Sequence, residues 1–243
     1  MLITQKEGAF LTVKNMNQYN IFGEIDNVIL NKETNNFEVK NMINITNECN
    51  MELMKRCKDN HFDLAIVDPP YKNIVAGLKA GFNRSEFNYE ALSTPPTKEY
   101  LNELFRVSKN QILWGFNYYL ELLPNTDGCI VWNKHQNGHF SEAELAWCSK
   151  GKTRIFDRAY QKDIGNKIHP TQKPYQLYEW LLINYAKEGD KILDTHLGSG
   201  SIAIACHNLK YDLTACELDK DYFESATKRL KQHQKQLTIF DVI

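Results

Sequence analysis

The stretch KILDTHLGSGS, residues 191–201, decides the fold of this chain. Its first half predicts a buried strand with Asp194 near the end, and its second half a glycine turn that opens a helix. This arrangement is typical of α/β folds that bind nucleotide-type ligands. Gly198 and Gly200 let the backbone turn tightly, and the first N–H groups of the helix face any negative group. The stretch therefore predicts a ligand site at this turn.

The strand predicted at residues 212–218 supports such a ligand. Glu217 lies near its end, and an acid at the end of the strand after the glycine turn typically holds two ribose hydroxyls. The third glycine of the dinucleotide fingerprint would fall at Ala203, a substitution that the fingerprint tolerates. The two features predict an adenosine-containing ligand and leave NAD open.

Strands and helices alternate on both sides of this stretch. Hydrophobic patterning predicts further strands at residues 42–46, 62–67, 111–115 and 129–133. Helices are predicted at residues 50–57, from Thr97 onward, and at 175–187, 198–209 and 220–236. The alternation favours an α/β fold: a Rossmann-like, doubly wound, mostly parallel sheet with helices on both faces. Ahead of these elements, NKETNN at residues 31–36 predicts a turn between two short strands.

Composition bounds the class of protein. The chain has 243 residues, 42% of them hydrophobic, which suits one domain over residues 1–243. We expect no membrane span, because no run of roughly 18 apolar residues occurs, and no secretory signal. The six cysteines are scattered without a CxxC pair. We therefore expect reduced thiols, a cytoplasmic location and no metal site.

A second stretch, IVDPPYKNI at residues 66–74, ends another predicted strand with an acid, two prolines and an aromatic ring. One interpretation is a strand-terminating turn, because proline cannot continue a central strand. The other is a rigid site that holds Asp68 and Tyr71 in fixed positions. Ligands bind at the carboxyl ends of parallel strands. Asp68 is thus expected beside the glycine turn, which favours the second interpretation.

A third stretch, HPTQKP at residues 169–174, precedes the helix predicted at 175–187. Lys173 offers a point charge and Thr171 a hydroxyl donor, a pair suited to a carboxylate. The alternative is a plain helix entry with Pro174 near the first helical position, which the motif alone leaves open.

Residues 133–173 are locally basic. They hold eight Lys or Arg and four Asp or Glu, a balance of 8 − 4 = +4, whereas the whole chain carries a net charge of −1. Trp147, Phe156 and Tyr160 lie among them. Basic residues mixed with aromatic ones can follow a phosphate backbone. A solvated face is the plainer interpretation.

The motifs D-P-P-Y, H-P-T-Q-K-P and D-x-x-x-G-S-G-S, in this order, resemble the S-adenosylmethionine-dependent amino-group DNA methyltransferases of the permuted β type. INITNECNMELMK at residues 43–55 is similar to the family's segment at the cofactor's adenine pocket. The resemblance covers roughly residues 40–235. Two departures stand out: Thr195-His196 follows the acid where the family usually has proline and phenylalanine, and Glu48 replaces an aspartate.

The resemblance implies a class I methyltransferase fold with a seven-stranded sheet, S-adenosyl-L-methionine as cofactor, and a role for each motif residue. The implied catalytic residues are Asp68, Pro69, Pro70 and Tyr71. The implied cofactor-binding residues are Glu48, Cys49, Asp68, Thr171, Lys173, Asp194, His196, Leu197, Gly198, Ser199, Gly200, Ser201, Glu217 and Leu218. The expected DNA contacts are Lys72, Lys134, Lys150, Lys152, Arg154 and Arg158. His196 fits a packing or hydrogen-bonding role better than that of a base.

The implied activity is methylation of the exocyclic amino group of adenine in double-stranded DNA. The target base is flipped out, because its amino nitrogen is inaccessible inside a duplex. Residues 72–92 are expected to form a mobile loop over that base. Residues 133–168 are expected to form a small target-recognition insert that holds the duplex. The family also implies a homodimer and a companion restriction endonuclease.

Other functions stay open at this point. The same chemistry serves N4 of cytosine, although the family's cytosine members more often carry serine in place of Asp68. RNA or a protein amide is a further substrate class. A non-catalytic DNA-binding module and a dinucleotide-dependent oxidoreductase are the remaining alternatives; the latter leaves D-P-P-Y unexplained.

Overall fold

The computed structural model describes residues 28–31, 36–39, 41–70, 95–136, 141–160 and 167–236. The chain divides into two units, residues 1–42 and 43–243. In the first unit, strands β1 (Val28–Asn31) and β2 (Asn36–Val39) pair antiparallel, as the turn signal between them predicts. The assignment of residues 1–243 to one methyltransferase domain stays a prediction.

The second unit is built on a sheet in which eight strands are described, in the order β3-β10-β9-β4-β5-β7-β6-β8. The strands are β3 (Ile43–Asn47), β4 (Leu64–Val67), β5 (Gln111–Trp114), β6 (Gly128–Asn133), β7 (Ala143–Cys148), β8 (Arg154–Asp157), β9 (Lys191–Asp194) and β10 (Asp212–Glu217). The first five strands in this spatial order, β3, β10, β9, β4 and β5, run parallel to one another. Strand β7 runs antiparallel to both β5 and β6. The predicted mostly parallel α/β sheet is confirmed.

The strand count differs from the predicted seven. Strands β7 and β8 come from residues 133–168, for which the sequence predicted an insert rather than sheet. Strand β7 pairs along its whole length with β6, from Gly128↔Cys148 to Asn133↔Ala143. Glu144 in β7 and the charged ends of β8 weaken the hydrophobic alternation by which such strands are recognised.

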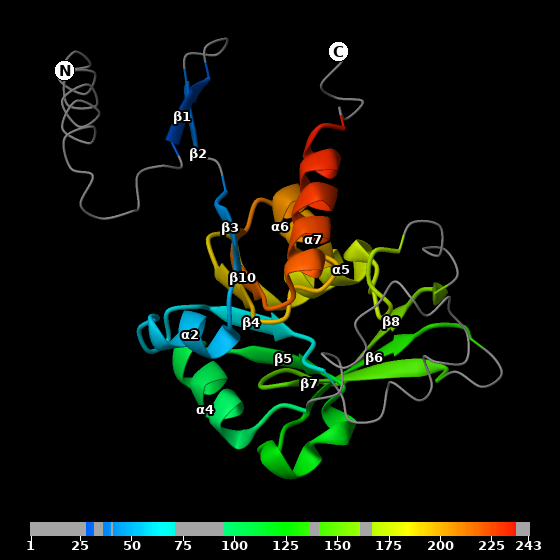
Figure 1. Cartoon of the computed structure of the whole chain (residues 1–243). Coiled ribbons are helices and arrows are strands. Elements are labelled where there is room, and N and C mark those ends of the chain that lie inside the picture. Colours follow the sequence, from blue (N-terminus) through cyan, green and yellow to red (C-terminus); the bar gives the residue numbers. More distant parts are fainter. Residues whose placement is uncertain are drawn as a thin grey trace, which may run out of the picture. The chain divides into compact units, whose positions relative to one another are not determined.

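Helices lie on both faces of the sheet (Figure 1). They are α2 (Asn50–Lys55), α4 (Lys98–Val107), α5 (Tyr175–Tyr185), α6 (Ser201–Leu209) and α7 (Lys220–Gln234). Two short 3-10 helices, η1 (Phe116–Tyr118) and η2 (Leu120–Leu122), follow β5. Each face has its own hydrophobic cluster: α5, α6 and α7 contribute to one, and α2 and α4 to the other.

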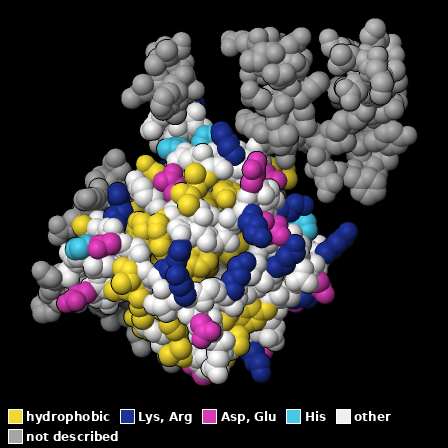
Figure 2. Space-filling view, turned by 180° about the vertical axis from the view of Figure 1, so that it is seen from behind, with side chains coloured by type: hydrophobic (Ala, Val, Ile, Leu, Met, Phe, Trp, Pro, Cys, Tyr) yellow, Lys and Arg dark blue, Asp and Glu magenta, His cyan; other side chains and the backbone are white. Residues whose placement is uncertain are grey.

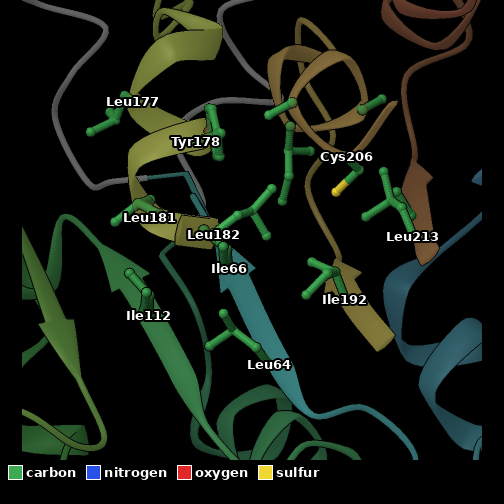
Figure 3. Close-up of a cluster of buried hydrophobic side chains, with 14 of the residues drawn as sticks. Leu64, Ile66, Ile112, Leu177, Tyr178, Leu181, Leu182, Ile192, Cys206 and Leu213 are labelled. Carbon is green, nitrogen blue, oxygen red and sulfur yellow. The ribbon is translucent and has the colours of Figure 1, made fainter. Parts of the chain in front are cut away.

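Strand β4 shows why both faces are covered. Leu64 and Ile66 belong to the cluster with α5 and α6, whereas Ala65 and Val67 belong to the cluster with α2 and α4. Successive side chains of a strand point to opposite faces, so an all-apolar strand needs a layer on each side. In Figure 3, Leu64 and Ile66 lie below α5. Burying each such side chain contributes about 1.5–3 kcal/mol.

Capping residues fix where two helices begin. Thr97 Oγ1 accepts a hydrogen bond from the Tyr100 backbone N–H at 3.2 Å, which confirms Thr97 as the N-cap of α4. Asp219 caps α7 by accepting from the N–H groups of Asp221 and Tyr222 at 2.9 and 3.1 Å. Among the described helices, none combines the length and apolar character that crossing a bilayer requires.

The sheet reverses its winding between β9 and β4. These strands are parallel neighbours, with Leu64 opposite Ile192 and Ala65 opposite Leu193. From β9 the chain continues through α6 to β10, on one side, and from β4 through α4 to β5, on the other. Ligands of open α/β sheets bind in the crevice that this reversal opens beyond the carboxyl ends of the strands. Asp68 and Asp194 lie at that crevice.

Candidate active site

A cavity of about 910 Å³ opens at the carboxyl edge of the sheet. That volume is within the usual range for small-molecule sites. The segments that line it come from distant parts of the chain: residues 48–51, 68–70, 95–100, 169–173, 195–199 and 217–222. The stretches singled out from the sequence thus meet at one place, as the parallel sheet predicts.

Most of the predicted cofactor residues line this cavity. They are Glu48, Cys49, Asp68, Thr171, Lys173, His196, Leu197, Gly198, Ser199, Glu217 and Leu218. Pro69 and Pro70 line it too. Asp194, Gly200 and Ser201 are not among the lining residues. Tyr71, Lys72 and the loop predicted at 72–92 lie outside the described residues.

Two glycines shape the turn after β9. Gly198 and Gly200 have φ of +53° and +71°, a backbone conformation that favours glycine. A Cβ added at Gly200 would lie 3.1 Å from the Cβ of Ala226, so α7 leaves little room for a side chain there. The Gly198 N–H donates to Glu217 Oε2 at 2.8 Å, which ties the turn to the end of β10.

Ser201 holds the turn in place instead of lining the cavity. Its hydroxyl donates to the Lys173 carbonyl oxygen at 2.6 Å. The Arg229 guanidinium of α7 donates to Ser201 Oγ at 2.9 Å and to the Ser199 carbonyl oxygen at 2.8 Å. These bonds fasten the glycine turn to the HPTQKP segment, so the predicted role of Ser201 as a ligand contact becomes a supporting one.

Asp194 lies beneath the cavity, with 2% of its surface exposed. Burial raises the pKa of its carboxyl to about 8, although the His196 N–H donates to Asp194 Oδ1 at 2.9 Å. Burial also raises the pKa of Glu217, against the hydrogen bonds from the Asp219 and Gly198 N–H groups. The buried Asp194 carboxyl orders the turn through its hydrogen bond from the His196 N–H, and its predicted contact with the cofactor stays a prediction.

Thr195-His196, the departure from the family pattern, forms a hydrogen-bond chain. Asn50 Nδ2 lies 3.0 Å from His196 Nε2, Thr195 Oγ1 lies 3.0 Å from His196 Nδ1, and the Tyr100 hydroxyl lies 2.6 Å from Thr195 Oγ1. Burial lowers the pKa of His196 to about 4, so the ring is neutral. The ring links α2, α4 and β9, in agreement with the predicted hydrogen-bonding role.

Asp68 is held by a buried lysine. The Lys173 ammonium lies 2.5 Å from Asp68 Oδ2 and 3.0 Å from Glu144 Oε2, and the Lys173 side chain is 2% exposed. Burial lowers the pKa of Lys173, but the two carboxylates outweigh it and the net shift is upward. The sequence assigned Lys173 to a ligand carboxylate. In the structure its charge is already engaged by two protein carboxylates.

Lys134 is also placed differently from the prediction. It was expected on a DNA-binding surface, yet it is buried, and its ammonium lies 3.3 Å from Glu144 Oε1. Its backbone follows β6, next to β7, where Glu144 lies. Lys134 therefore belongs to the charge network behind Asp68, and we do not include it among the proposed DNA contacts.

His169 was missed from the sequence. Its Nδ1 lies 3.3 Å from the Thr171 backbone nitrogen and 3.1 Å from Thr171 Oγ1, and its ring meets the Tyr222 ring edge-on with centroids 4.4 Å apart. Burial lowers its pKa to about 3, so the imidazole is neutral. Asn50, Tyr100 and Tyr222 were missed as well, because their contacts join segments far apart in sequence.

Glu48 lines the cavity just before α2. Arg56 binds it through two nitrogens, Nη1 at 2.7 Å from Oε2 and Nη2 at 2.8 Å from Oε1. These bonds, with one from Thr46, lower the pKa of Glu48. The lining also holds four further acids and two leucines, which make it partly acidic and partly apolar: Asp68, Glu99, Glu217, Asp219, Leu197 and Leu218. Such a lining fits an adenosine-containing cation, as the prediction requires.

The predicted DNA contacts lie at two opposite ends of the strands: the end where Asp68 follows β4, called here the Asp68 edge, and the opposite end. Lys150 and Lys152 lie in the connection from β7 to β8, and Arg154 begins β8 next to Asn184 at the end of α5. Because β7 runs antiparallel to β5, this connection is at the edge opposite Asp68. Arg158 follows β8 at the Asp68 edge, and its N–H donates to the Asn133 carbonyl oxygen at 3.2 Å.

No single basic field marks the described residues on the face shown in Figure 2. There, Lys and Arg side chains are interspersed with acidic and hydrophobic ones. Of the described basic residues in 133–173, Lys134 and Lys173 are buried, whereas Lys150 and Lys152 are exposed. Lys150, Lys152 and Arg154 stay predicted DNA contacts. Arg158 also stays a prediction, and it lies at the same end of the strands as Asp68.

Comparison with known proteins gives consistent matches. A family model described as N6_N4_Mtase, DNA methylase, matches residues 4–228. Type II methyltransferase M.HpaI of Haemophilus parainfluenzae is 24% identical over 224 residues, 74% of this chain and 71% of that protein. Type II methyltransferase M.HinfI of Haemophilus influenzae is 31% identical over 238 residues, 75% of this chain and 66% of that protein.

Solved structures share the fold. PvuII DNA methyltransferase (cytosine-N4-specific) matches with a TM-score of 0.52 at 10% identity, over 82% of this chain and 95% of that one. TTHA0409 of Thermus thermophilus, a putative DNA modification methylase complexed with S-adenosyl-L-methionine, matches with a TM-score of 0.52 at 16% identity, over 81% of this chain and 96% of that one. The shared architecture is that of DNA methyltransferases.

Proposed function

This chain belongs to the N6/N4 DNA methylase family, which methylates base amino groups with S-adenosyl-L-methionine, and we propose that it acts on N6 of adenine in double-stranded DNA. The observation that carries this proposal is the position of Asp68-Pro69-Pro70. The three residues follow β4 at the winding reversal and line the cavity, and Lys173 holds the Asp68 carboxylate. Aspartate at this position favours adenine over cytosine.

Asp68 and the Pro69 carbonyl oxygen supply two hydrogen-bond acceptors for the target amino group. The exocyclic nitrogen of adenine is a weak nucleophile because its lone pair is delocalised into the ring. Two acceptors aimed at its N–H groups favour a tetrahedral nitrogen with a localised lone pair. The consecutive prolines restrict the backbone that carries both acceptors, so they are in place before the base arrives.

The cavity walls hold the cofactor and the flipped base. Glu217 and Leu218 at the end of β10, with Glu48 before α2, are proposed to bind the adenosine part, and the glycine turn lets the backbone approach. When bound, S-adenosyl-L-methionine supplies an electrophilic methyl group on a sulfonium. Tyr71 is proposed to stack on the flipped base, and residues 72–92 to close over it.

Replacing Glu217 by Gln is expected to weaken cofactor binding about 10- to 100-fold. A hydrogen bond to a charged group contributes roughly 1.5–3 kcal/mol and one to a neutral group roughly 0.5–1.5 kcal/mol, and the carboxylate is proposed to bind two ribose hydroxyls. Titration calorimetry with S-adenosyl-L-methionine measures the change. Glu188→Gln, an exposed position between α5 and β9, is the matched control. An unchanged dissociation constant in Glu217→Gln rejects the assignment.

Arg158→Ala is expected to weaken binding to duplex DNA and to reduce the salt dependence of the affinity by about one phosphate contact. Its position at the Asp68 edge of β8 is the reason. Affinity measured at several salt concentrations tests this, with exposed Lys187→Ala as control. The same measurement on Lys152→Ala decides whether the opposite edge also reaches DNA. An Arg158→Ala slope equal to that of the wild type contradicts the placement.

Sequencing of DNA methylated by the purified protein tests the function as a whole. Nucleoside analysis of the same DNA distinguishes N6-methyladenine, the expected product, from N4-methylcytosine. Transfer to RNA alone, or to no nucleic acid at all, contradicts the proposal. Strict dependence on S-adenosyl-L-methionine rather than NAD separates it from an oxidoreductase.

We further propose a cytoplasmic setting in which the protein marks DNA that a companion restriction endonuclease would otherwise cut. Type II methyltransferases among the relatives support this setting. Plasmid DNA from cells that express the protein is then expected to resist cleavage by the companion enzyme. A homodimer is the proposed assembly, which analytical ultracentrifugation tests.

A further inference from the structure

Glu144 joins two buried lysines behind the site, and neither the motifs nor the family resemblance gave it a role. It lies in β7, opposite Trp132 of β6. Its Oε2 is 3.0 Å from the Lys173 ammonium and its Oε1 is 3.3 Å from the Lys134 ammonium. Each carboxylate oxygen thus has its own cation.

The network continues from Glu144 to Asp68. Lys173 lies between the two carboxylates, 2.5 Å from Asp68 Oδ2. The exposed fractions of the side chains are 2% for Lys173, 17% for Asp68 and 31% for Glu144. The Lys173 ammonium also lies over the Trp114 ring, 5.2 Å from its centre. A buried cation is costly unless it is paired, so the two carboxylates hold the ammonium where it lies.

We propose that Glu144 is a positioning residue for Asp68 and acts through Lys173. This inference rests on the proposed function of Asp68 as an acceptor for the target amino group. Glu144 holds the ammonium from the side of β7, so that Lys173 fixes the orientation of the Asp68 carboxylate. The residue is 76 positions after Asp68 in the sequence (144 − 68) and comes from a different part of the sheet.

Two effects follow when Glu144 loses its charge. Lys173 is then held by one carboxylate instead of two, so its long side chain and the Asp68 carboxylate gain freedom to move. The positive charge is also shared with Asp68 alone, which weakens Asp68 as an acceptor for a further N–H group. Both effects lower the rate of transfer and leave binding of cofactor and DNA largely intact, because misplacement of a reacting group by about 1 Å costs as much as 10²-fold.

Glu144→Gln tests the proposal with nearly unchanged volume. We expect kcat for methyl transfer to fall roughly 10- to 100-fold, with KM for DNA and for S-adenosyl-L-methionine changed less than about twofold. Glu144→Asp, which keeps the charge, is expected to recover part of kcat. Exposed Glu188→Gln is the matched control and is expected to behave as wild type. Wild-type kcat in Glu144→Gln overturns the inference, and so does a loss confined to KM.

A second measurement does not depend on activity. Selective ¹³Cε labelling of lysines allows the pKa of Lys173 to be followed by NMR, with the signal assigned through its absence in Lys173→Arg. Asp68 and Glu144 contact its ammonium, and Lys134 binds the other oxygen of Glu144. Asp194 and His169 also interact electrostatically with Lys173, and Lys167 interacts with Glu144. Because Glu144 raises the pKa of Lys173, a lower pKa is expected in Glu144→Gln. An unchanged pKa overturns the coupling.

The two failures are distinguishable. Wild-type protein that transfers no methyl group to DNA contradicts the proposed function. Active wild type with an equally active Glu144→Gln contradicts this inference alone.

Discussion

Replacing Asp68 by Ala is expected to abolish methyl transfer, with a loss of at least about 10²–10³-fold in kcat. The substitution removes one of the two acceptors proposed for the target amino group, at the carboxyl end of β4. The fold is expected to survive, because Lys173 keeps Glu144 as its partner. Binding of S-adenosyl-L-methionine is expected to survive as well. Transfer of a labelled methyl group to duplex DNA and titration calorimetry measure the two properties.

Exposed Asp127→Ala is the matched control for this experiment, since it also removes an aspartate carboxylate, but at a position that does not line the cavity. Full activity in Asp68→Ala contradicts the assignment of Asp68 as an acceptor for the target amino group. Loss of cofactor binding together with activity would instead place Asp68 in the cofactor pocket and leave its role toward the base without support.

Lys173→Met is expected to destabilise the folded state by roughly 3–5 kcal/mol, because removing one partner leaves buried charge uncompensated. Asp68 and Glu144 would face one another across the space that the ammonium now fills. For a chain of this size, each kcal/mol lowers Tm by about 2–4 °C, so a fall of about 10 °C is expected in thermal unfolding followed by circular dichroism.

Lys152→Met, at an exposed position, is the control and is expected to unfold as wild type does. The double variant Lys173→Met/Glu144→Gln is expected to recover part of the lost stability, since the Asp68 and Glu144 side chains, no longer separated by the ammonium, then carry one negative charge instead of two. Equal Tm values for wild type and Lys173→Met show that the buried network contributes nothing measurable and contradict the prediction.

The architecture could be predicted because strand signals and helix signals alternate along the chain. The apolar strand at β4 and the strand, glycine turn and helix from β9 to α6 predict a parallel sheet whose carboxyl edge gathers the motifs. Where the hydrophobic pattern does not predict a strand, pairing with neighbouring strands determines the structure. Strand β7 carries the charged Glu144, and pairing with β5 and β6 is what makes the segment a strand.

Individual side-chain roles depended on contacts that motifs do not encode. Lys173 was assigned to a ligand carboxylate by its chemistry, and that chemistry was right, but the carboxylates belong to Asp68 and Glu144. Lys150 and Lys152 share a basic stretch with Arg158. The antiparallel direction of β7 nevertheless places them at the opposite edge of the sheet, and no residue in the stretch signals that direction.

Arg229 of α7 binds the glycine turn, and through Ser201 that turn is fastened to the Lys173 carbonyl oxygen. Helix α7 is the last described element to leave the ribosome. A nascent chain in which the Asp68 motif has been synthesised, but α7 has not, therefore lacks the hydrogen bonds from Arg229 to the glycine turn. We therefore expect chains whose synthesis stops before α7 to bind S-adenosyl-L-methionine poorly and to modify little DNA.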